Sequence, residues 1–177
     1  MTTDYSRMTF AELRNVKLKK MDRQEVEKRI ASFLKSCNIC VLATCKDDVP
    51  RATPIEYYSE GLTVYVVADP GTKIVNLKAN PRISVGIYNT PYTNWFDWKI
   101  VRGIQITGKP VLINDDNPEY FEAMKIYNWR LYSTVAGRQM DKPPTGRTII
   151  KVEPLKIEYR DLGLLAEGFL RVQTWEA

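Results

Sequence analysis

The residues of this chain that are best suited to hold an anion come from one turn and from a strand before it. Gly71, Thr72 and Lys73 open a short predicted helix, and the first backbone amides of a helix favour a phosphate. Thr72 adds a hydroxyl donor and Lys73 a full positive charge. Alone, such a turn is more often a simple N-cap. Arg51, which shares a strand face with Thr53, can reach the same anion and therefore favours a phosphate site.

The 177 residues include no histidine, and this excludes several classes of site. Ser-His-Asp and Cys-His catalysis, and histidine ligation of zinc or haem, all need that side chain. Cys37 and Cys40 form a C-x-x-C pair, but Cys40 lies in an apolar run that predicts a buried strand, where positions three apart face opposite ways. We predict no metal site. No catalytic residue is evident, and Tyr57 and Lys73 are acid-base candidates by location only.

The charge and hydropathy of the chain narrow its partners. The net charge of +5 and the pI near 9.0 suggest affinity for an anion. Because acidic residues interleave with the basic ones, a local phosphate site is favoured over nucleic acid or a membrane surface. The first twenty residues are polar and do not resemble a secretory signal, and no apolar run is long enough to span a bilayer. We expect a cytoplasmic protein.

Periodic patterns define the elements that must position these residues. Asp22, with Glu25 three residues on, is a suitable N-cap for an amphipathic helix over 23–36. Asn117, followed by proline, predicts a later helix that extends to about Val135. Runs rich in β-branched and aromatic residues predict strands. These strands cover residues 39–45, 50–58, 62–68, 82–89, 98–113, 147–153 and 155–160, and the short helix after Lys73 ends at Asn80-Pro81.

Together these elements predict a mainly β fold with three helices as covers. The close spacing of the strands over 39–45, 50–58 and 62–68 favours an antiparallel meander or barrel. Barrel closure hides the edges of such a sheet. No linker or repeat interrupts the chain, so we expect an N-terminal extension over residues 1–21 and a single domain over 22–177.

The order of motifs between Ile39 and Ile87 resembles the flavin-binding core of the pyridoxamine 5'-phosphate oxidase-like superfamily. Each motif alone is weak, but the ordered series is specific, and a looser resemblance continues toward residue 160. The series comprises Leu42-Ala43-Thr44 on a strand, an acidic turn, R-x-x-P from Arg51 to Pro54, a Leu-x-Val-Tyr hairpin strand, Gly71-Thr72-Lys73 with its helix, and the run from Asn76 to Val85.

This resemblance implies a six-stranded antiparallel split β-barrel that binds FMN in a cleft between the two subunits of a homodimer. It implies that Arg51 and Lys73 hold the flavin phosphate, with Thr72 assisting. In the oxidase, a glutamine of the partner subunit also contacts the flavin. The matching position here is Gly103, and Gln105 on the same strand face is the candidate substitute. The residues implied to flank the flavin ring are Thr53, Pro54, Ile55, Val66, Val67 and Ala68.

The chain departs from the oxidase in the elements that recognise substrate. The oxidase has a C-terminal Arg-x-His element for pyridoxal phosphate, which residues 164–177 lack, so oxidation of vitamin B6 is not expected. The haem-degrading branch also commonly relies on histidine. A flavin-dependent oxidoreductase acting on a small conjugated substrate stands first, and a non-catalytic flavin carrier or electron-transfer module second. A deazaflavin-dependent relative and a nucleic-acid-binding barrel are further alternatives.

Two groups of aromatic residues could contribute to a substrate pocket. The first lies between two predicted strands and could stack on a planar substrate, plug a barrel end or form a dimer contact. The second lies on the later helix and could join the same pocket or pack that helix on the barrel. The first group is Tyr92, Trp95, Phe96 and Trp98, and the second is Trp129, Arg130 and Tyr132.

Overall fold

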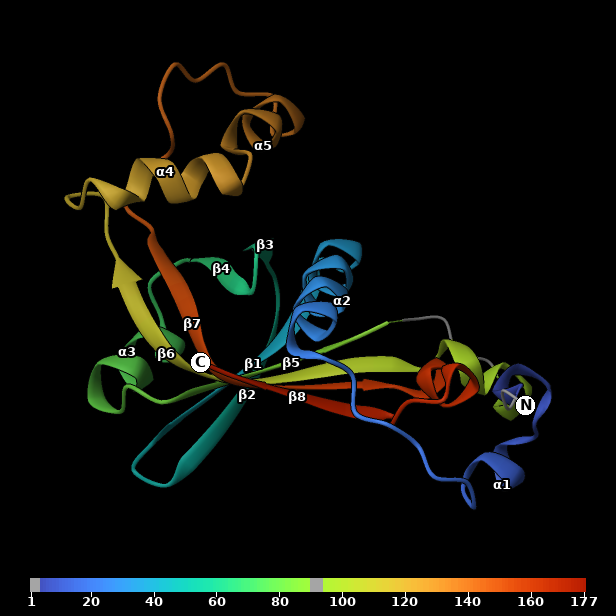
Figure 1. The fold of residues 1–177 in the computed structure, drawn as a ribbon. Helices are drawn as coiled ribbons and strands as arrows, with labels where there is room; N and C mark the ends of the chain where they lie inside the picture. Colours follow the sequence, from blue (N-terminus) through green and yellow to red (C-terminus); the bar gives the residue numbers. More distant parts are fainter. Residues whose placement is uncertain (1–3, 90–93) are drawn as a thin grey trace.

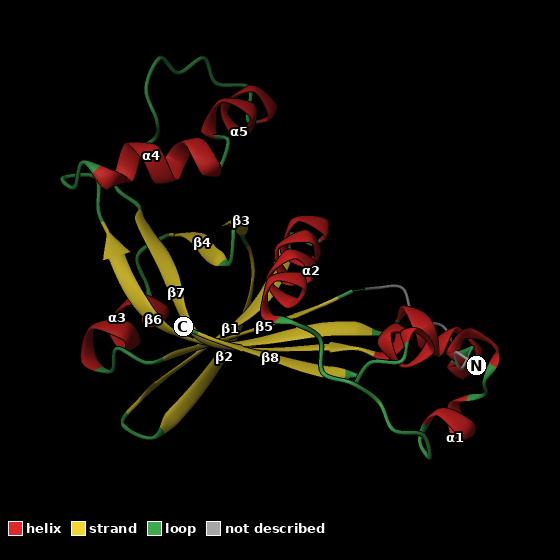
Figure 2. Cartoon of the chain, in the orientation of Figure 1, coloured by secondary structure: helices red, strands yellow, loops and turns green. Residues whose placement is uncertain are grey.

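One curled antiparallel β-sheet forms the body of this computed structural model, which describes residues 4–89 and 94–177 (Figures 1 and 2). Its strands are β1 (Ile39–Lys46), β2 (Val49–Glu56), β3 (Tyr58–Glu60), β4 (Thr63–Ala68), β5 (Ile83–Tyr88), β6 (Arg102–Ile113), β7 (Thr148–Asp161) and β8 (Val172–Glu176). Its α-helices are α1 (Phe10–Leu13), α2 (Arg23–Ser36), α3 (Thr72–Ala79), α4 (Glu119–Ile126) and α5 (Trp129–Val135), and its 3-10 helices are η1 (Tyr5–Arg7), η2 (Trp95–Ile100) and η3 (Leu162–Glu167).

The order of the strands explains how the sheet curls. It runs β2-β1-β5-β6-β7-β4-β3, so the two end strands, β2 and β3, are consecutive in the chain and are separated by Tyr57 alone. Tyr57 is buried, and its hydroxyl donates a hydrogen bond to the Leu34 carbonyl of α2 at 2.7 Å. The predicted split barrel is confirmed. The sheet has eight strands instead of six because Tyr57 interrupts the run over 50–58 and the C-terminal tail pairs with β7 as β8.

A bulge in β7 separates the barrel from an arm. The register between β6 and β7 shifts at Thr107 and Gly108, where Gly108 lies opposite Pro154. Before this point β7 pairs with β4, and after it β7 pairs with β8. The predicted strands over 147–153 and 155–160 are therefore one bent strand. The arm extends to the right of the barrel in Figure 1 and carries η3 at its end.

The helix over 23–36 forms as predicted. The Asp22 side chain accepts a hydrogen bond from the Glu25 amide at 2.9 Å, which caps the first turn of α2. Its buried face packs into the main hydrophobic core inside the barrel. That face consists of Val26, Ile30, Phe33 and Leu34.

Three predicted elements differ in the structure. The helix expected to reach Val135 is two helices, because Asn128 adopts a left-handed conformation (φ 54°, ψ 51°) that ends α4. The strand expected from residue 98 begins at Arg102, since η2 occupies residues 95–100. The predicted run over 50–58 is divided at Tyr57: its first part, β2, pairs with β1, and its end, β3, pairs with β4, so of the two expected arrangements the barrel forms.

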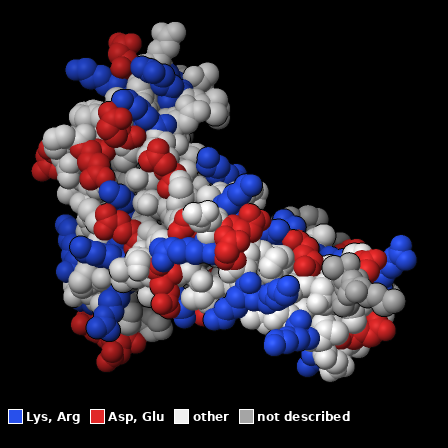
Figure 3. Space-filling model, in the orientation of Figure 1, with Lys and Arg blue, Asp and Glu red and all other residues white. Residues whose placement is uncertain are grey.

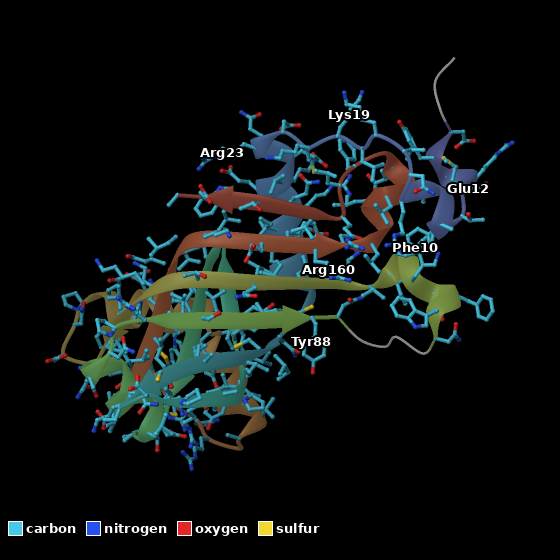
Figure 4. The ribbon with its side chains drawn as sticks, turned by 90° about the horizontal axis from the view of Figure 1, so that it is seen from below. Phe10, Glu12, Lys19, Arg23, Tyr88 and Arg160 are labelled. Atoms are coloured by element: carbon cyan, nitrogen blue, oxygen red, sulfur yellow. The ribbon has the colours of Figure 1, made fainter. Side chains whose placement is uncertain are left out.

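The N-terminal segment packs along the arm. Its Lys19 amide donates to the Gly168 carbonyl at 3.0 Å, and the Leu170 amide donates to the Lys19 carbonyl at 2.9 Å. On the face of the sheet opposite the barrel core, Figure 4 shows β8, β7, β6, β5 and β1 with no helix in front of them. This outer face of the sheet, on which Tyr88 and Arg160 lie, is uncovered in the single chain.

Candidate functional site

The elements that carry the two predicted phosphate-binding cations join where α3 packs on β1 beside β2. In the β1–β2 register, Thr44 lies opposite Arg51, so their side chains share the inner face of the sheet. The side-chain amide of Asn76 on α3 donates a hydrogen bond to the Thr44 hydroxyl at 3.0 Å, and both side chains are buried. Lys73 lies one helical turn before Asn76. This buried Asn76–Thr44 hydrogen bond therefore brings the helix that carries Lys73 onto the strand pair that carries Arg51.

Helix α3 begins without a side-chain cap. Gly71 is its N-cap residue and contributes no side chain, while the amides of Ile74 and Val75 both bond the Gly71 carbonyl. Within the described residues, no hydrogen bond occupies the amides of Thr72 and Lys73, and no carboxylate pairs with the Lys73 ammonium. The start of α3 thus offers free amides beside a half-buried cation.

Thr53 supplies the observation that points most directly to a ligand. It lies opposite Leu42 on β1, on the same face as Arg51 and two residues away from it. Its hydroxyl oxygen is buried and has no hydrogen-bond partner in the described part of the chain. Leaving a buried polar atom unsatisfied costs about 1–3 kcal/mol, so a bound group that pairs with it would recover that energy. Arg51 itself is exposed on β2 and makes no ion pair with a described residue.

The donor set at this junction suits a phosphate monoester. A guanidinium, an ammonium, two hydroxyls and helix amides all donate hydrogen bonds to anionic oxygens. These groups come from Arg51, Thr53, Thr72 and Lys73, four of the residues that the sequence singles out. Sequence reasoning did not identify Thr44 and Asn76 as the pair that joins the elements. The sequence feature that could have found them is a polar residue at a position expected to be buried: Thr44 in an apolar strand, and Asn76 on the inward face of a helix.

The remaining predicted residues divide between the two faces of the sheet. Pro54 lies opposite Val41 and shares the outer face of the sheet with Gln105 of β6. Arg51 is on the inner face, so within one chain the side chains of Pro54 and Gln105 lie on the other side of the sheet from the Arg51 side chain. Val66 and Ala68 are fully buried in the barrel core, backbone as well as side chain, and both lie in the part of β4 that pairs with β7. The other two are partly buried: Ile55 packs against the barrel core and Val67 against the aromatic residues under α4 and α5.

The outer face of the sheet contains a hollow of about 600 Å³. Small side chains create it, because three strands carry glycine, alanine or serine where a larger residue would fill the space. Gln105 lies at its edge, beside Glu158 and Arg160 of β7. The small residues of the hollow are Ala43, Ser84, Gly86 and Gly103.

The two aromatic groups lie apart and form no common pocket. Phe96 and Trp95 on η2 are 96% and 71% exposed on the arm, and Trp98 packs edge-on against Phe10 with ring centroids 5.1 Å apart. Trp129, the first residue of α5, is buried, and α5 lies at the top of Figure 1, far from the arm. Tyr92 lies outside the described residues.

The charges and cysteines of the described chain mark no other site. Lysine and arginine intermingle with acidic residues over the face in Figure 3. All three cysteines are free, and burial raises the pKa of the Cys40 thiol to about 12. No group of three or more potential metal-binding side chains occurs among the described residues. Across those same residues, no helix has the length and apolar character needed to cross a membrane.

Comparison with known proteins defines the class first. The curled sheet is the fold of a Listeria innocua protein provisionally named pyridoxamine 5'-phosphate oxidase (TM-score 0.58, 22% identity, covering 78% of this chain and 98% of that one). It is also the fold of an FAD-binding protein of Mesorhizobium loti (TM-score 0.56, 16% identity, covering 79% and 93%). These likenesses show a shared split-barrel fold.

The family follows from the sequence. Residues 26–161 match the family model of pyridoxamine 5'-phosphate oxidase, and the chain belongs to this family. An uncharacterized protein of Rhizobium meliloti is 30% identical over 89 residues, which are 50% of this chain and 53% of that relative. The matched segment thus spans about half the length of that relative.

Proposed function

We propose that this chain binds FMN at the junction of β2 and α3 and acts as a flavin-dependent oxidoreductase on a small conjugated substrate. The observation that carries the proposal is the buried, unpartnered hydroxyl of Thr53 beside Arg51 and the open start of α3. Membership of a family whose structural relatives include an FAD-binding protein supports a flavin as the ligand. Two cations and a single helix start suit the one phosphate of FMN.

In this proposal the phosphate and the ring are held by different groups. Arg51 and Lys73 neutralise the phosphate, and the Thr72 hydroxyl donates to its oxygens. The resemblance places Thr53 beside the flavin ring, and we assign its buried hydroxyl to the phosphate instead, because it shares the strand face of Arg51. Pro54 and Ile55, with the β4 segment Val66–Ala68, flank the ring. Bound FMN supplies hydride or single-electron chemistry, and the protein contributes position and electrostatics.

The alternative within the same site is a flavin carrier or electron-transfer module. It is favoured by the chemistry of the junction, where the polar side chains of the proposed site are cations, hydroxyls and an amide, and no carboxylate or thiol is among them. Turnover separates the two functions. A catalyst reduced by NADH or NADPH consumes an added acceptor over many cycles, whereas a carrier exchanges electrons once for each bound flavin.

We further propose a homodimer formed through the outer face of the sheet. Uncovered sheet faces with a hollow lined by small residues are typical of interfaces, because a second surface can approach the strands closely. In such a dimer, Gln105 of one chain would lie near the flavin of the other. This arrangement would bring the two sets of predicted residues into one cleft.

The binding test uses variants of the two cations. We expect purified protein to be yellow and to release FMN, and Arg51→Ala and Lys73→Ala each to raise the Kd for FMN about 10- to 100-fold, since a charged hydrogen bond contributes about 1.5–3 kcal/mol. Lys78→Ala, an exposed cation of the same helix, is the matched control and should bind as the wild type does. Colourless protein that takes up no added FMN would contradict the proposal.

A further inference from the structure

Arg147 contacts the segment that leads into the proposed phosphate site. It directly precedes β7, whose first residue, Thr148, pairs with Ala68 at the end of β4. From there its Nε lies 3.2 Å from Oδ1 of Asp69. Asp69 is two residues before Gly71, at the start of the turn that opens α3. Arg147 is therefore the side chain that pairs with the acid of this turn.

The same guanidinium also contacts the helical lobe formed by α4 and α5. Its central carbon lies 5.6 Å from the centroid of the Tyr132 ring on α5, a cation–π distance. Tyr132 in turn packs against Tyr127, with ring centroids 5.8 Å apart. The lobe rests on the outer side of β4, where it covers Val67 and Tyr65. Arg147 thus joins the turn before α3 to a packed aromatic cluster.

This position has an electrostatic consequence for the turn. The Asp69 side chain is 74% exposed and would repel a phosphate bound two or three residues away, whereas the Arg147 side chain is only 29% exposed and is held by its neighbours. An exposed ion pair contributes little to stability by itself. What the pair does is neutralise Asp69 and hold its backbone in one place, and the amides of Thr72 and Lys73 follow directly in the chain.

We propose that Arg147 is a positioning residue for the phosphate site: through Asp69 it fixes the turn that presents the Thr72 and Lys73 amides, and through Tyr132 it ties that turn to the helical lobe. The proposal rests on the proposed function, because the anion it serves is the phosphate of FMN. It assigns a role to an arginine that lies outside the sequence motifs of the flavin-binding core.

The test compares FMN with riboflavin, which has the same ring and no phosphate. We expect Arg147→Gln to raise the Kd for FMN about 5- to 20-fold and to leave the Kd for riboflavin within about twofold. Asp69→Asn breaks the same contact but also removes the charge that repels the phosphate, so it should raise the Kd for FMN by less than Arg147→Gln does. The double variant should lose no more than Arg147→Gln, because both substitutions act through one contact. Arg147→Lys, which can still pair with Asp69, should recover part of the affinity.

Arg23→Gln is the matched control, since Arg23 also combines an ion pair, with Glu27 at 3.1 Å, and a ring contact, with Trp175 at 5.3 Å, away from the turn. Its Kd for FMN should equal that of the wild type. An equal loss of riboflavin and FMN affinity would overturn the proposal, as would wild-type FMN affinity in Arg147→Gln. Wild-type protein that binds no FMN refutes the proposed function instead.

Discussion

Cys40 and Tyr57 are two ionisable side chains that the fold removes from water. Each is only 1% exposed in the barrel core. Burial raises the pKa of both groups, that of the Cys40 thiol to about 12. Because the charged form is disfavoured in the interior, both stay neutral near physiological pH. Cys40 therefore does not act as a redox thiolate with Cys37, and Tyr57, an acid-base candidate by location, serves to close the barrel.

The raised pKa of Cys40 predicts a loss of stability in alkali. Below its ordinary pKa of 9.0 the thiol is neutral in both states, so its full contribution is present. Between there and about 12 only the unfolded chain ionises, and the free energy of unfolding should fall by about 1.4 kcal/mol per pH unit for this group. Denaturant unfolding of wild type and Cys40→Ala from pH 7 to 10.5 measures the difference.

Cys45→Ala, a substitution at a partly buried cysteine of the same strand, controls for the loss of a thiol as such. We expect Cys40→Ala to show a shallower slope than the wild type above pH 9. Parallel slopes for wild type and Cys40→Ala would show that the thiol is not what titrates.

At the scale of the elements, the bend where β6 pairs with β7 is a place that accepts only a glycine, Gly108. An added Cβ at Gly108 would lie 2.6 Å from Val152 Cγ1 and 2.9 Å from the Glu153 carbonyl oxygen. A glycine is needed because the two strands approach each other closely where the register shifts. At this point β7 changes partner from β4 to β8, so the bend determines where the barrel ends and the arm begins.

Gly108→Ala should therefore destabilise the protein by about 1–3 kcal/mol, the usual cost of forcing an extra carbon into a packed site. Denaturant midpoints measure this effect. Gly71→Ala is the comparison, since an added Cβ there meets no atom within 4 Å, and its loss should be clearly smaller. Equal losses for the two variants would mean that the close approach at Gly108 is not the cause.

Patterns along the chain predicted most individual elements but not all of their boundaries. The cap at Asp22, the helix over 23–36 and the short helix after Gly71 follow from local spacing, and the structure confirms them. The break at Asn128 was not evident, because a left-handed residue leaves no signature in an apolar helical period. The tail strand β8 was missed because Trp175 is anchored by Glu27, a residue of α2 far away in sequence.

For the whole molecule, the uncovered face of the sheet is the feature that a single chain leaves unexplained. Helices cover the inner face and the lobe covers β4, yet five strands face outward without cover (Figure 4). The hollow on that face is lined by small residues, one of which, Gly86, has no atom within 4 Å of an added Cβ. A larger side chain at Gly86 can therefore be accommodated by the monomer but not by a tightly packed partner.

Gly86→Arg should split the proposed dimer while leaving the chain folded. We expect sedimentation or light scattering to give twice the 20.5 kDa chain mass for wild type and the single mass for the variant, with unchanged far-ultraviolet circular dichroism. Leu155→Arg, an exposed apolar position of β7 outside the hollow, should remain dimeric. A wild-type monomer, or a dimeric Gly86→Arg, would refute an interface at this hollow.

Residue composition excludes histidine chemistry, and spacing over a few positions predicts the local periods and the residue types able to hold a phosphate. The pairing of β4 with β7, the hydrogen bond that joins Asn76 of α3 to Thr44, and the burial of the Thr53 hydroxyl without a described partner are visible in the folded chain alone. Strand pairing and burial depend on groups distant in the chain. The anion site predicted from Arg51 and Lys73 is now a junction of two strands and a helix.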